Sequence, residues 1–230
     1  MASKRILMVL TSHARMGDSG KATGLWAEEF AEPYYLFTEA GHTVEIATPA
    51  GGQVPFDPNS LKPRGENGGA VDRMLGDSAV MARLATTAQT RAFSAADFDA
   101  IFLPGGHGTM WDLPADVALA QLLQDAAASG GIVAAVCHGP AGLVSARGAD
   151  GRPLVAGRKV SAFTDEEEAA AGLQAIVPFA LETRLRELGA VIDKAAPWQA
   201  HAVRDGFLVT GQNPQSSRLV AEKTLEALGA

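Results

Sequence analysis

The chain contains a single cysteine, Cys137, at a position where a reactive side chain could be presented. Residues 131–136, just before it, are small and β-branched apolar residues, which predicts a buried strand of a parallel sheet. His138-Gly139-Pro140 follows and predicts a sharp turn into a helix. This junction resembles a nucleophile elbow, with main-chain N–H groups behind the sulfur. We therefore expect Cys137 to be a nucleophile whose thiolate is favoured by the helix N-terminus, although a lone cysteine is often only a small buried hydrophobe.

A carboxylate on the first predicted helix, residues 24–40, is the second candidate. The apolar stripe of this helix is formed by Trp26, Phe30, Pro33 and Phe37, and Glu29 belongs to the same face. A carboxyl on an apolar face loses its hydration, so its pKa rises and it can stay protonated beside a thiolate. The alternative is that Glu29 lies at the edge of the stripe and reaches water.

His138 is the candidate base, because an elbow can bring the imidazole back toward the sulfur. An acidic partner would then fix the tautomer of the ring. The run Asp165-Glu166-Glu167-Glu168 offers such a partner, but the residues alone do not choose among the three glutamates. Asp165 with Glu168 could instead form a capping box at a helix start.

A glycine-rich turn, Pro104-Gly105-Gly106-His107-Gly108, follows another predicted buried strand. The N–H groups of Gly106 and His138 would converge on a developing oxyanion, and His107 would contact the substrate in the same place. The turn could also bind phosphate, but the chain has neither a P-loop lysine nor a dinucleotide fingerprint. The five histidines show no paired ligand spacing, so we expect no metal and no cofactor.

Strands alternate with helices along the chain, which predicts an α/β fold with a mostly parallel sheet covered on both faces. Ligands of such sheets bind beyond the carboxyl ends of the strands, where both Cys137 and the glycine-rich turn fall. The predicted strands are 6–10, 43–48, 100–103, 131–136 and 160–163, with a hairpin of 201–203 and 207–210. The predicted helices are 24–40, 72–86, 115–129, 178–188 and 214–228.

Composition narrows the class of protein. The 230 residues carry a net charge of −7, which argues against a nucleic-acid or anionic-membrane partner. No linker or shift in composition divides the chain, so we expect one domain over residues 1–230. One cysteine allows no intrachain disulfide, and no segment predicts a signal peptide or membrane span, so the expected location is the cytoplasm.

Several motifs together resemble the ThiJ/PfpI superfamily, and within it the branch of heat-shock chaperones and glutathione-independent glyoxalases. They lie at 23–29, 104–114, 136–140, 162–168, 177–182 and 205–214. The resemblance implies a flavodoxin-like three-layer α/β/α sandwich and a homodimer. It also implies that Cys137 is the nucleophile, His138 its partner, Glu29 the acid near the thiolate and Glu168 the residue that orients His138.

The resemblance further implies an enzyme of the glyoxalase III type, a cysteine-dependent lyase. It would convert methylglyoxal or glyoxal, small dicarbonyl substrates, to the 2-hydroxy acid through a cysteine hemithioacetal. Two alternatives stay open. One is a holdase chaperone with little turnover, and the other is a cysteine-dependent amidase, peptidase or isonitrile hydratase of the same superfamily.

Overall fold

A seven-stranded sheet forms the centre of the protein in the computed structural model, which describes residues 3–229. The strand order is β3-β2-β1-β4-β5-β9-β8, and only β8 runs antiparallel to its neighbour. The strands are β1 (Arg5–Val9), β2 (Thr43–Thr48), β3 (Ala88–Gln89), β4 (Ala100–Leu103), β5 (Ile132–Val136), β8 (Ala202–Asp205) and β9 (Leu208–Gly211). A separate pair, β6 (Lys159–Val160) and β7 (Val191–Ile192), lies outside this sheet.

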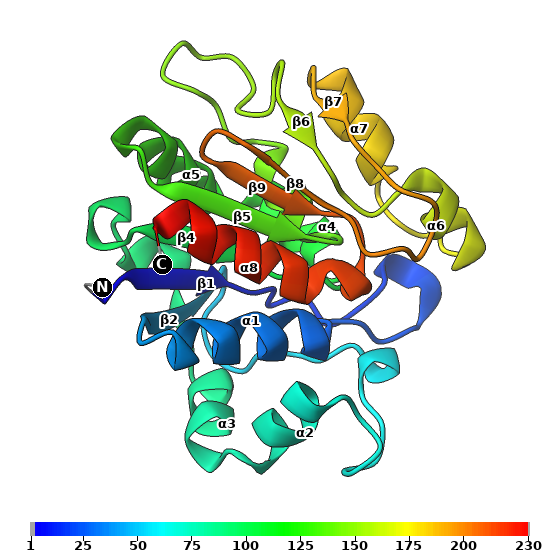
Figure 1. Cartoon of the computed structure of the whole chain (residues 1–230). Coiled ribbons are helices and arrows are strands. Elements are labelled where there is room, and N and C mark those ends of the chain that lie inside the picture. The colour runs from blue at the N-terminus through cyan, green and yellow to red at the C-terminus, as the bar shows by residue number, and fades with distance from the viewer. Residues whose placement is uncertain (1–2, 230) are drawn as a thin grey trace.

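Helices cover both faces of the sheet, as Figure 1 shows. The helices α1 (Ala27–Glu39) and α8 (Ser217–Leu228) lie side by side on one face, with α2 (Gly69–Gly76) and α3 (Ser78–Ala85) beyond α1. The other face carries α4 (Thr109–Asp112) and α5 (Val117–Ser129), while α7 (Leu181–Glu187) lies against β7 with α6 (Asp165–Ala170) beside it. This arrangement confirms the predicted three-layer α/β/α sandwich.

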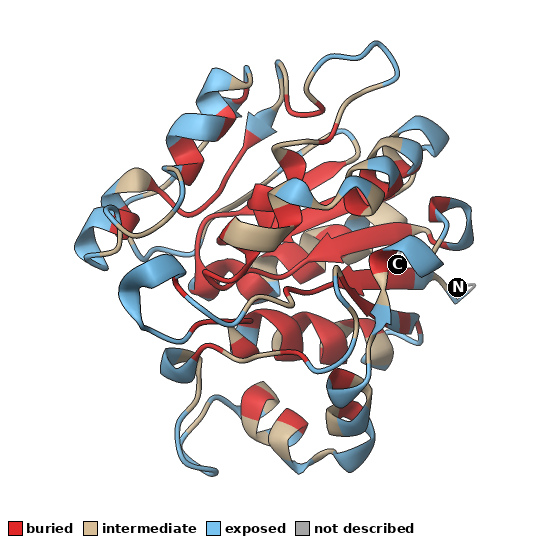
Figure 2. Ribbon diagram, turned by 180° about the vertical axis from the view of Figure 1, so that it is seen from behind, coloured by how far each residue is buried: buried red, intermediate tan, exposed pale blue. Residues whose placement is uncertain are grey.

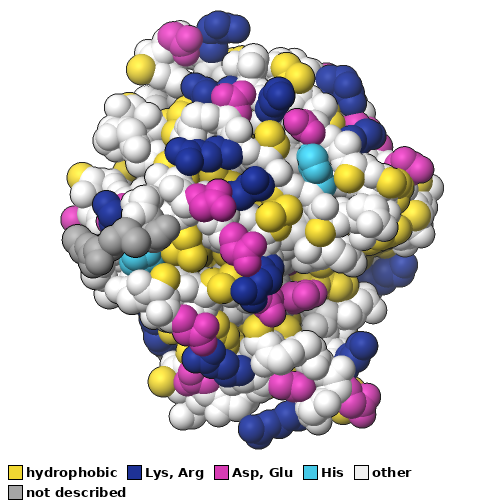
Figure 3. Space-filling model, viewed as in Figure 1, with side chains coloured by type: hydrophobic (Ala, Val, Ile, Leu, Met, Phe, Trp, Pro, Cys, Tyr) yellow, Lys and Arg dark blue, Asp and Glu magenta, His cyan; other side chains and the backbone are white. Residues whose placement is uncertain are grey.

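The side chains of the strands alternate between two apolar cores. Met8 and Phe102 pack under α1, whereas Leu7 and Ile101 pack on the opposite face with the leucines of α5. Figure 2 shows the result, since the central strands are buried throughout while the outer helices are exposed on one side. Over α1 and α8 the surface mixes both signs of charge (Figure 3). Arg218 of α8 pairs there with Glu32 of α1 and with Glu222.

Some predicted boundaries were wrong. The helix expected over 72–86 is two helices, because Asp77 ends α2 and its carboxylate accepts from the N–H groups of Ala79 and Val80 to begin α3. The strand expected at 160–163 is reduced to the two residues of β6, and the short strand β3 was not predicted. The single domain over 1–230 stays a prediction. None of the helices in the described part of the chain combines the length and apolar character that a membrane crossing needs.

The sheet brings the candidate residues to one edge. In register, Leu103 at the end of β4 pairs with Ala135 near the end of β5. Because both strands run in the same direction, the glycine-rich turn after β4 and Cys137 after β5 leave the sheet side by side. The first turn of α1, which carries Glu29, joins the same edge, and the N–H of Trp26 donates to the carbonyl of Gly105.

Candidate active site

Cys137 lies on a strained turn directly after β5. Its φ is 59°, and Trp198 is the other non-glycine residue with a left-handed φ in the described chain. Such a conformation costs energy in a residue with a Cβ, so its presence at a sulfur points to function. Gly139 makes the turn fit, because a Cβ there would collide with the carbonyl oxygen of Leu103. The turn leads into a 3₁₀ helix over Gly139–Leu143, so the α-helix expected to favour the thiolate is absent at this point of the described chain.

The sulfur is largely enclosed but not sealed. Cys137 is 3% exposed and lines a cavity of about 420 Å³ at the edge of the sheet. Apolar and aromatic side chains form much of the wall, together with two acidic residues. The residues that line the cavity are Met16, Trp26, Glu28, Asp57, Asn59, Gly106, His107, Cys137, His138, Phe163, Ala171, Leu173, Trp198, Pro214 and Gln215.

His138 turns back toward the sulfur of its neighbour. Its Nδ1 lies 3.3 Å from Sγ of Cys137, and its Nε2 lies 2.8 Å from Oε2 of Glu168. The ring of Phe163 packs on the imidazole, with the ring centres 4.3 Å apart. Burial lowers the pKa of His138 to about 4, and the nearby His107 acts in the same direction. The ring is therefore neutral at physiological pH.

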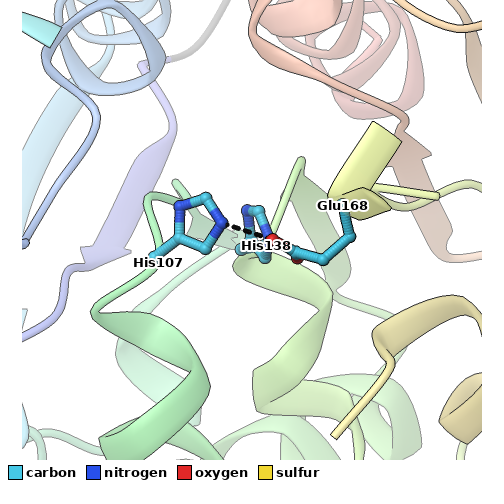
Figure 4. A group of neighbouring side chains, drawn as sticks. All are labelled: His107, His138 and Glu168. Carbon is cyan, nitrogen blue, oxygen red and sulfur yellow. Dashed lines mark hydrogen bonds and ion pairs between the residues drawn. The ribbon is translucent and has the colours of Figure 1, made fainter. Parts of the chain in front are cut away.

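Glu168 binds two histidines at once (Figure 4). Its Oε1 lies 2.8 Å from Nε2 of His107, and its Oε2 lies at the same distance from Nε2 of His138. Burial opposes the charge of Glu168, but the two hydrogen bonds outweigh it and lower the pKa to about 2. An ionised carboxylate only accepts hydrogen bonds, so both rings must present Nε2–H to it. In the neutral ring of His138, Nδ1 is then the unprotonated nitrogen, and it faces the sulfur.

The register of α6 selects Glu168 from the three neighbouring glutamates. Thr164 is the N-cap of the helix, and it forms a capping box with Glu167. The capping box that the sequence offered between Asp165 and Glu168 is therefore wrong, because the helix is capped one residue earlier. Glu166 is exposed, and Glu168 is left free to reach the histidines.

Glu167 has a structural role that the sequence analysis did not predict. Its Oε1 accepts hydrogen bonds from the main-chain N–H of Trp198 at 2.8 Å, from Gln212 at 3.1 Å and from Asn213 at 2.9 Å. These bonds hold the segment of Trp198 at the rim of the cavity. The pattern Thr-x-x-Glu over 164–167 could have predicted this role, since it is the sequence of a capping box.

Glu29 is fully buried, so the alternative that it reaches water is wrong. Its Oε2 accepts the main-chain N–H of Gly105 at 2.7 Å. Its Oε1 is buried without a conventional hydrogen-bond partner, and the carboxyl faces the thiol of Cys137. Burial raises the pKa of Glu29 to about 8, which keeps the carboxyl protonated at neutral pH.

Burial also raises the pKa of the Cys137 thiol, and an ionised Glu29 would raise it further. A protonated Glu29 instead has a hydrogen to donate to the sulfur, which favours the thiolate. The main-chain N–H of His138 acts in the same direction. The groups beside the thiol are thus these donors and the facing imidazole rather than an α-helix.

The main chain offers two donors beside the sulfur. Gly106 and His138 both line the cavity, and within residues 3–229 neither N–H donates to a carbonyl oxygen. Gly106 has a φ of 100°, and a Cβ there would collide with the carbonyl of Gly24, so the loop needs glycine at this position. The predicted oxyanion role of these groups stays a prediction.

His107, His138 and Glu168 are also the group of side chains, among the described residues, whose donor atoms lie close enough to hold a metal ion, all within 4.8 Å of one another. Each imidazole Nε2 is already matched by its own oxygen of Glu168. The three side chains therefore satisfy one another as a hydrogen-bonded group.

The site thus combines a cysteine on a left-handed turn at the carboxyl edge of a parallel sheet with a carboxylate-bound histidine that faces the sulfur. A model of the DJ-1/PfpI family matches residues 22–227, and the chain belongs to that family.

Curated relatives and solved structures match along the whole chain. The Glutathione-independent glyoxalase HSP31 of Saccharomyces cerevisiae is 33% identical, with 99% of each chain covered. The crystal structure of glyoxalase III from Candida albicans is 30% identical with a TM-score of 0.88, and 97% of each chain is covered. The Rapid Encystment Protein 24 KDa of Francisella tularensis is 35% identical with a TM-score of 0.93, over 98% of this chain and 99% of the other.

Proposed function

We propose that this protein is a cysteine-dependent glyoxalase that converts methylglyoxal or glyoxal to the 2-hydroxy acid without glutathione. The observation that carries the proposal is the 3.3 Å contact between Sγ of Cys137 and Nδ1 of His138 at the wall of the cavity. The full-length similarity to proteins named as glutathione-independent glyoxalases supports the same reaction.

The chemistry begins when His138 takes the thiol proton and the sulfur adds to the aldehyde carbon, which gives a hemithioacetal. The N–H groups of Gly106 and His138 hold the oxygen that becomes negative. Isomerisation moves one hydrogen from the aldehyde carbon to its neighbour and yields a lactoyl thioester on Cys137. Water then cleaves the thioester, which releases lactate and regenerates the thiol, so the reaction is balanced without an oxidant.

The test is product formation from a panel of substrates with no added thiol. Purified protein is incubated with methylglyoxal, glyoxal, a short peptide amide and an isonitrile, and the products are identified by chromatography. Lactate from methylglyoxal, with little turnover of the other classes, supports the proposal. Hydrolysis of the amide or hydration of the isonitrile without lactate formation would replace it.

One observation favours a second candidate, a hydrolase or hydratase with a larger substrate. The cavity of about 420 Å³ far exceeds what a three-carbon dicarbonyl fills, and Trp26, Phe163 and Trp198 line it. The same panel of substrates distinguishes this candidate from the glyoxalase. A holdase chaperone is the alternative of another class, and its activity in an aggregation assay would survive replacement of Cys137 by alanine.

The proposal extends to assembly and location. We propose a homodimer in the reducing cytoplasm, as the family resemblance and the lone reduced thiol suggest. Light scattering coupled to size-exclusion chromatography measures the mass of the assembly. A mass close to that of one 23.8 kDa chain at micromolar concentration would contradict the dimer.

A further inference from the structure

We propose that His107 is the base that moves the substrate proton between the two carbons, so that the site contains two histidines with separate tasks. This inference rests on the proposed glyoxalase function and assigns a step that the cysteine and its partner leave open. His138 then takes the proton of the Cys137 thiol, and His107 transfers a proton between the substrate carbons. The carboxylate of Glu168 connects the two histidines.

The geometry of the pair sets the tautomer of His107. Nε2 of His107 lies 2.8 Å from Oε1 of Glu168, which can only accept, so the proton sits on Nε2. The other ring nitrogen points away from Glu168 (Figure 4). Among residues 3–229 this Nδ1 has no hydrogen-bond partner. It is also not one of the side-chain atoms that are fully buried without a partner, so solvent can reach it. His107 lines the cavity, and a tenth of its side chain is exposed.

The other two candidate bases are occupied or out of reach. Glu29 is fully buried, lies outside the wall of the cavity and is bound to the N–H of Gly105. Nδ1 of His138 faces Sγ of Cys137, and its Nε2 is held by Glu168. Of the three groups Glu29, His138 and His107, His107 therefore presents the free lone pair that a proton transfer at carbon needs.

Ring packing and a main-chain hydrogen bond hold His107 in place. The ring centres of the two histidines are 4.0 Å apart, and Phe163 packs against both. The main chain is held as well, because the carbonyl of His107 accepts the N–H of Met110 at the start of α4. A base held beside the nucleophile needs little reorganisation to act on a substrate bound to that sulfur.

The proposed step balances without another reactant. Nδ1 of His107 removes the hydrogen from the carbon that carries sulfur and hydroxyl, and the electron pair of that bond forms an enediolate with the neighbouring ketone. The same nitrogen then returns the proton to the former ketone carbon. The hydroxyl on the sulfur-bearing carbon becomes the carbonyl of the thioester, its proton passes to the other oxygen, and the imidazole ends neutral.

The main test uses His107→Gln, because the side-chain amide N–H of glutamine can still donate to Glu168 while the base is lost. His201→Gln is the matched control, since His201 also pairs with a carboxylate, Asp193, at 2.9 Å but lies outside the cavity wall. Three quantities are measured. They are the kcat for lactate, its isotope effect with methylglyoxal deuterated at the aldehyde carbon, and the rate of Cys137 alkylation by iodoacetamide.

We expect His107→Gln to lower kcat by about 100-fold or more, the usual contribution of a general base, and to raise the isotope effect. Alkylation of Cys137 should stay within about twofold of the wild type, because His138 and Cys137 are untouched. His201→Gln should match the wild type in all three measurements. In His107→Ala, added imidazole should restore part of the activity, which also covers the case in which glutamine disturbs the fold.

Two results would overturn the inference. One is a kcat for His107→Gln within about tenfold of the wild type with an unchanged isotope effect. The other is a parallel loss of turnover and alkylation with no rescue by imidazole, since His107 would then only support the Cys137–His138 pair. Failure of the wild type to form lactate is a separate outcome, which removes the proposed function itself.

Discussion

The main-chain N–H of Gly105 donates to Oε2 of Glu29 across 2.7 Å, and this bond decides which oxygen of the carboxyl carries a proton. Since Oε2 is occupied as an acceptor, the proton of the neutral carboxyl belongs on Oε1, which lacks any other partner. The carboxyl faces Cys137, so the proton is available to the sulfur. The glycine-rich turn thereby determines which oxygen of Glu29 is protonated, although the two segments are distant in the sequence.

The pH profile of turnover should have two limbs set by His138 and Glu29. Proton removal from the thiol needs a neutral His138, so activity falls as the pH drops through about 4. It also needs a protonated Glu29, so activity falls as the pH rises through about 8. Measuring kcat/KM for lactate formation between these limits and beyond gives the profile. Replacing Glu29 by glutamine should remove the basic limb, and an unchanged basic limb in that variant would contradict the assignment.

The stability of the protein should depend on the proton of Glu29. The carboxyl keeps this proton up to about pH 8 when folded but releases it above its ordinary pKa of 4.5 when unfolded. The stabilisation that protonated Glu29 contributes to the free energy of unfolding is therefore complete below pH 4.5 and is lost as the pH rises through about 8. The free energy of unfolding changes by at most about 1.4 kcal/mol per pH unit over this range. Urea unfolding at several pH values should show that Glu29→Gln gains stability relative to the wild type from pH 5 to 8. A constant difference would be evidence against a buried neutral carboxyl.

The three consecutive glutamates of α6 should respond differently to the same substitution. Glu168→Gln removes one of the two acceptors of the histidines and should lower kcat by about 100-fold, because the tautomers are no longer fixed. Glu167→Gln should destabilise the fold by about 2 kcal/mol, since its carboxylate accepts several buried donors. Glu166→Gln is the matched control and should change neither quantity, because Glu166 is exposed. Turnover and urea unfolding of all three variants check this, and equal effects would refute it.

A methyl group at Gly105 should damage the site directly. A Cβ there would lie 2.6 Å from the main-chain nitrogen of His138 and 2.8 Å from Oε2 of Glu29. Gly105→Ala should cost about 1–3 kcal/mol in stability, as overpacking does, and lower turnover more than tenfold. Gly68→Ala is the control, because its Cβ would meet nothing within 4 Å at an ordinary φ of −62°. Wild-type turnover in Gly105→Ala would show that the turn has room for the extra methyl group.

The parts of the site that rest on local patterns could be predicted from the sequence. The alternation of apolar strands and helices indicated a parallel sheet covered on both faces, and the apolar stripe of α1 put Glu29 on the helix face that the structure buries, because helical periodicity is a local property. The dual contact of Glu168 could not be predicted, since it depends on how a loop carries α6 over the edge of the sheet. The break at Asp77 was missed because one capping carboxylate overrides a continuous apolar pattern. The helix expected after Cys137 is a 3₁₀ helix over Gly139–Leu143 rather than an α-helix.

The most direct test of the central claim is lactate formation from methylglyoxal by Cys137→Ala, compared with the wild type at equal concentration and without glutathione. The account predicts that the wild type forms lactate and that the variant falls to the uncatalysed background, because the substrate is carried on that sulfur throughout. Turnover by the folded variant within about tenfold of the wild type would contradict the account.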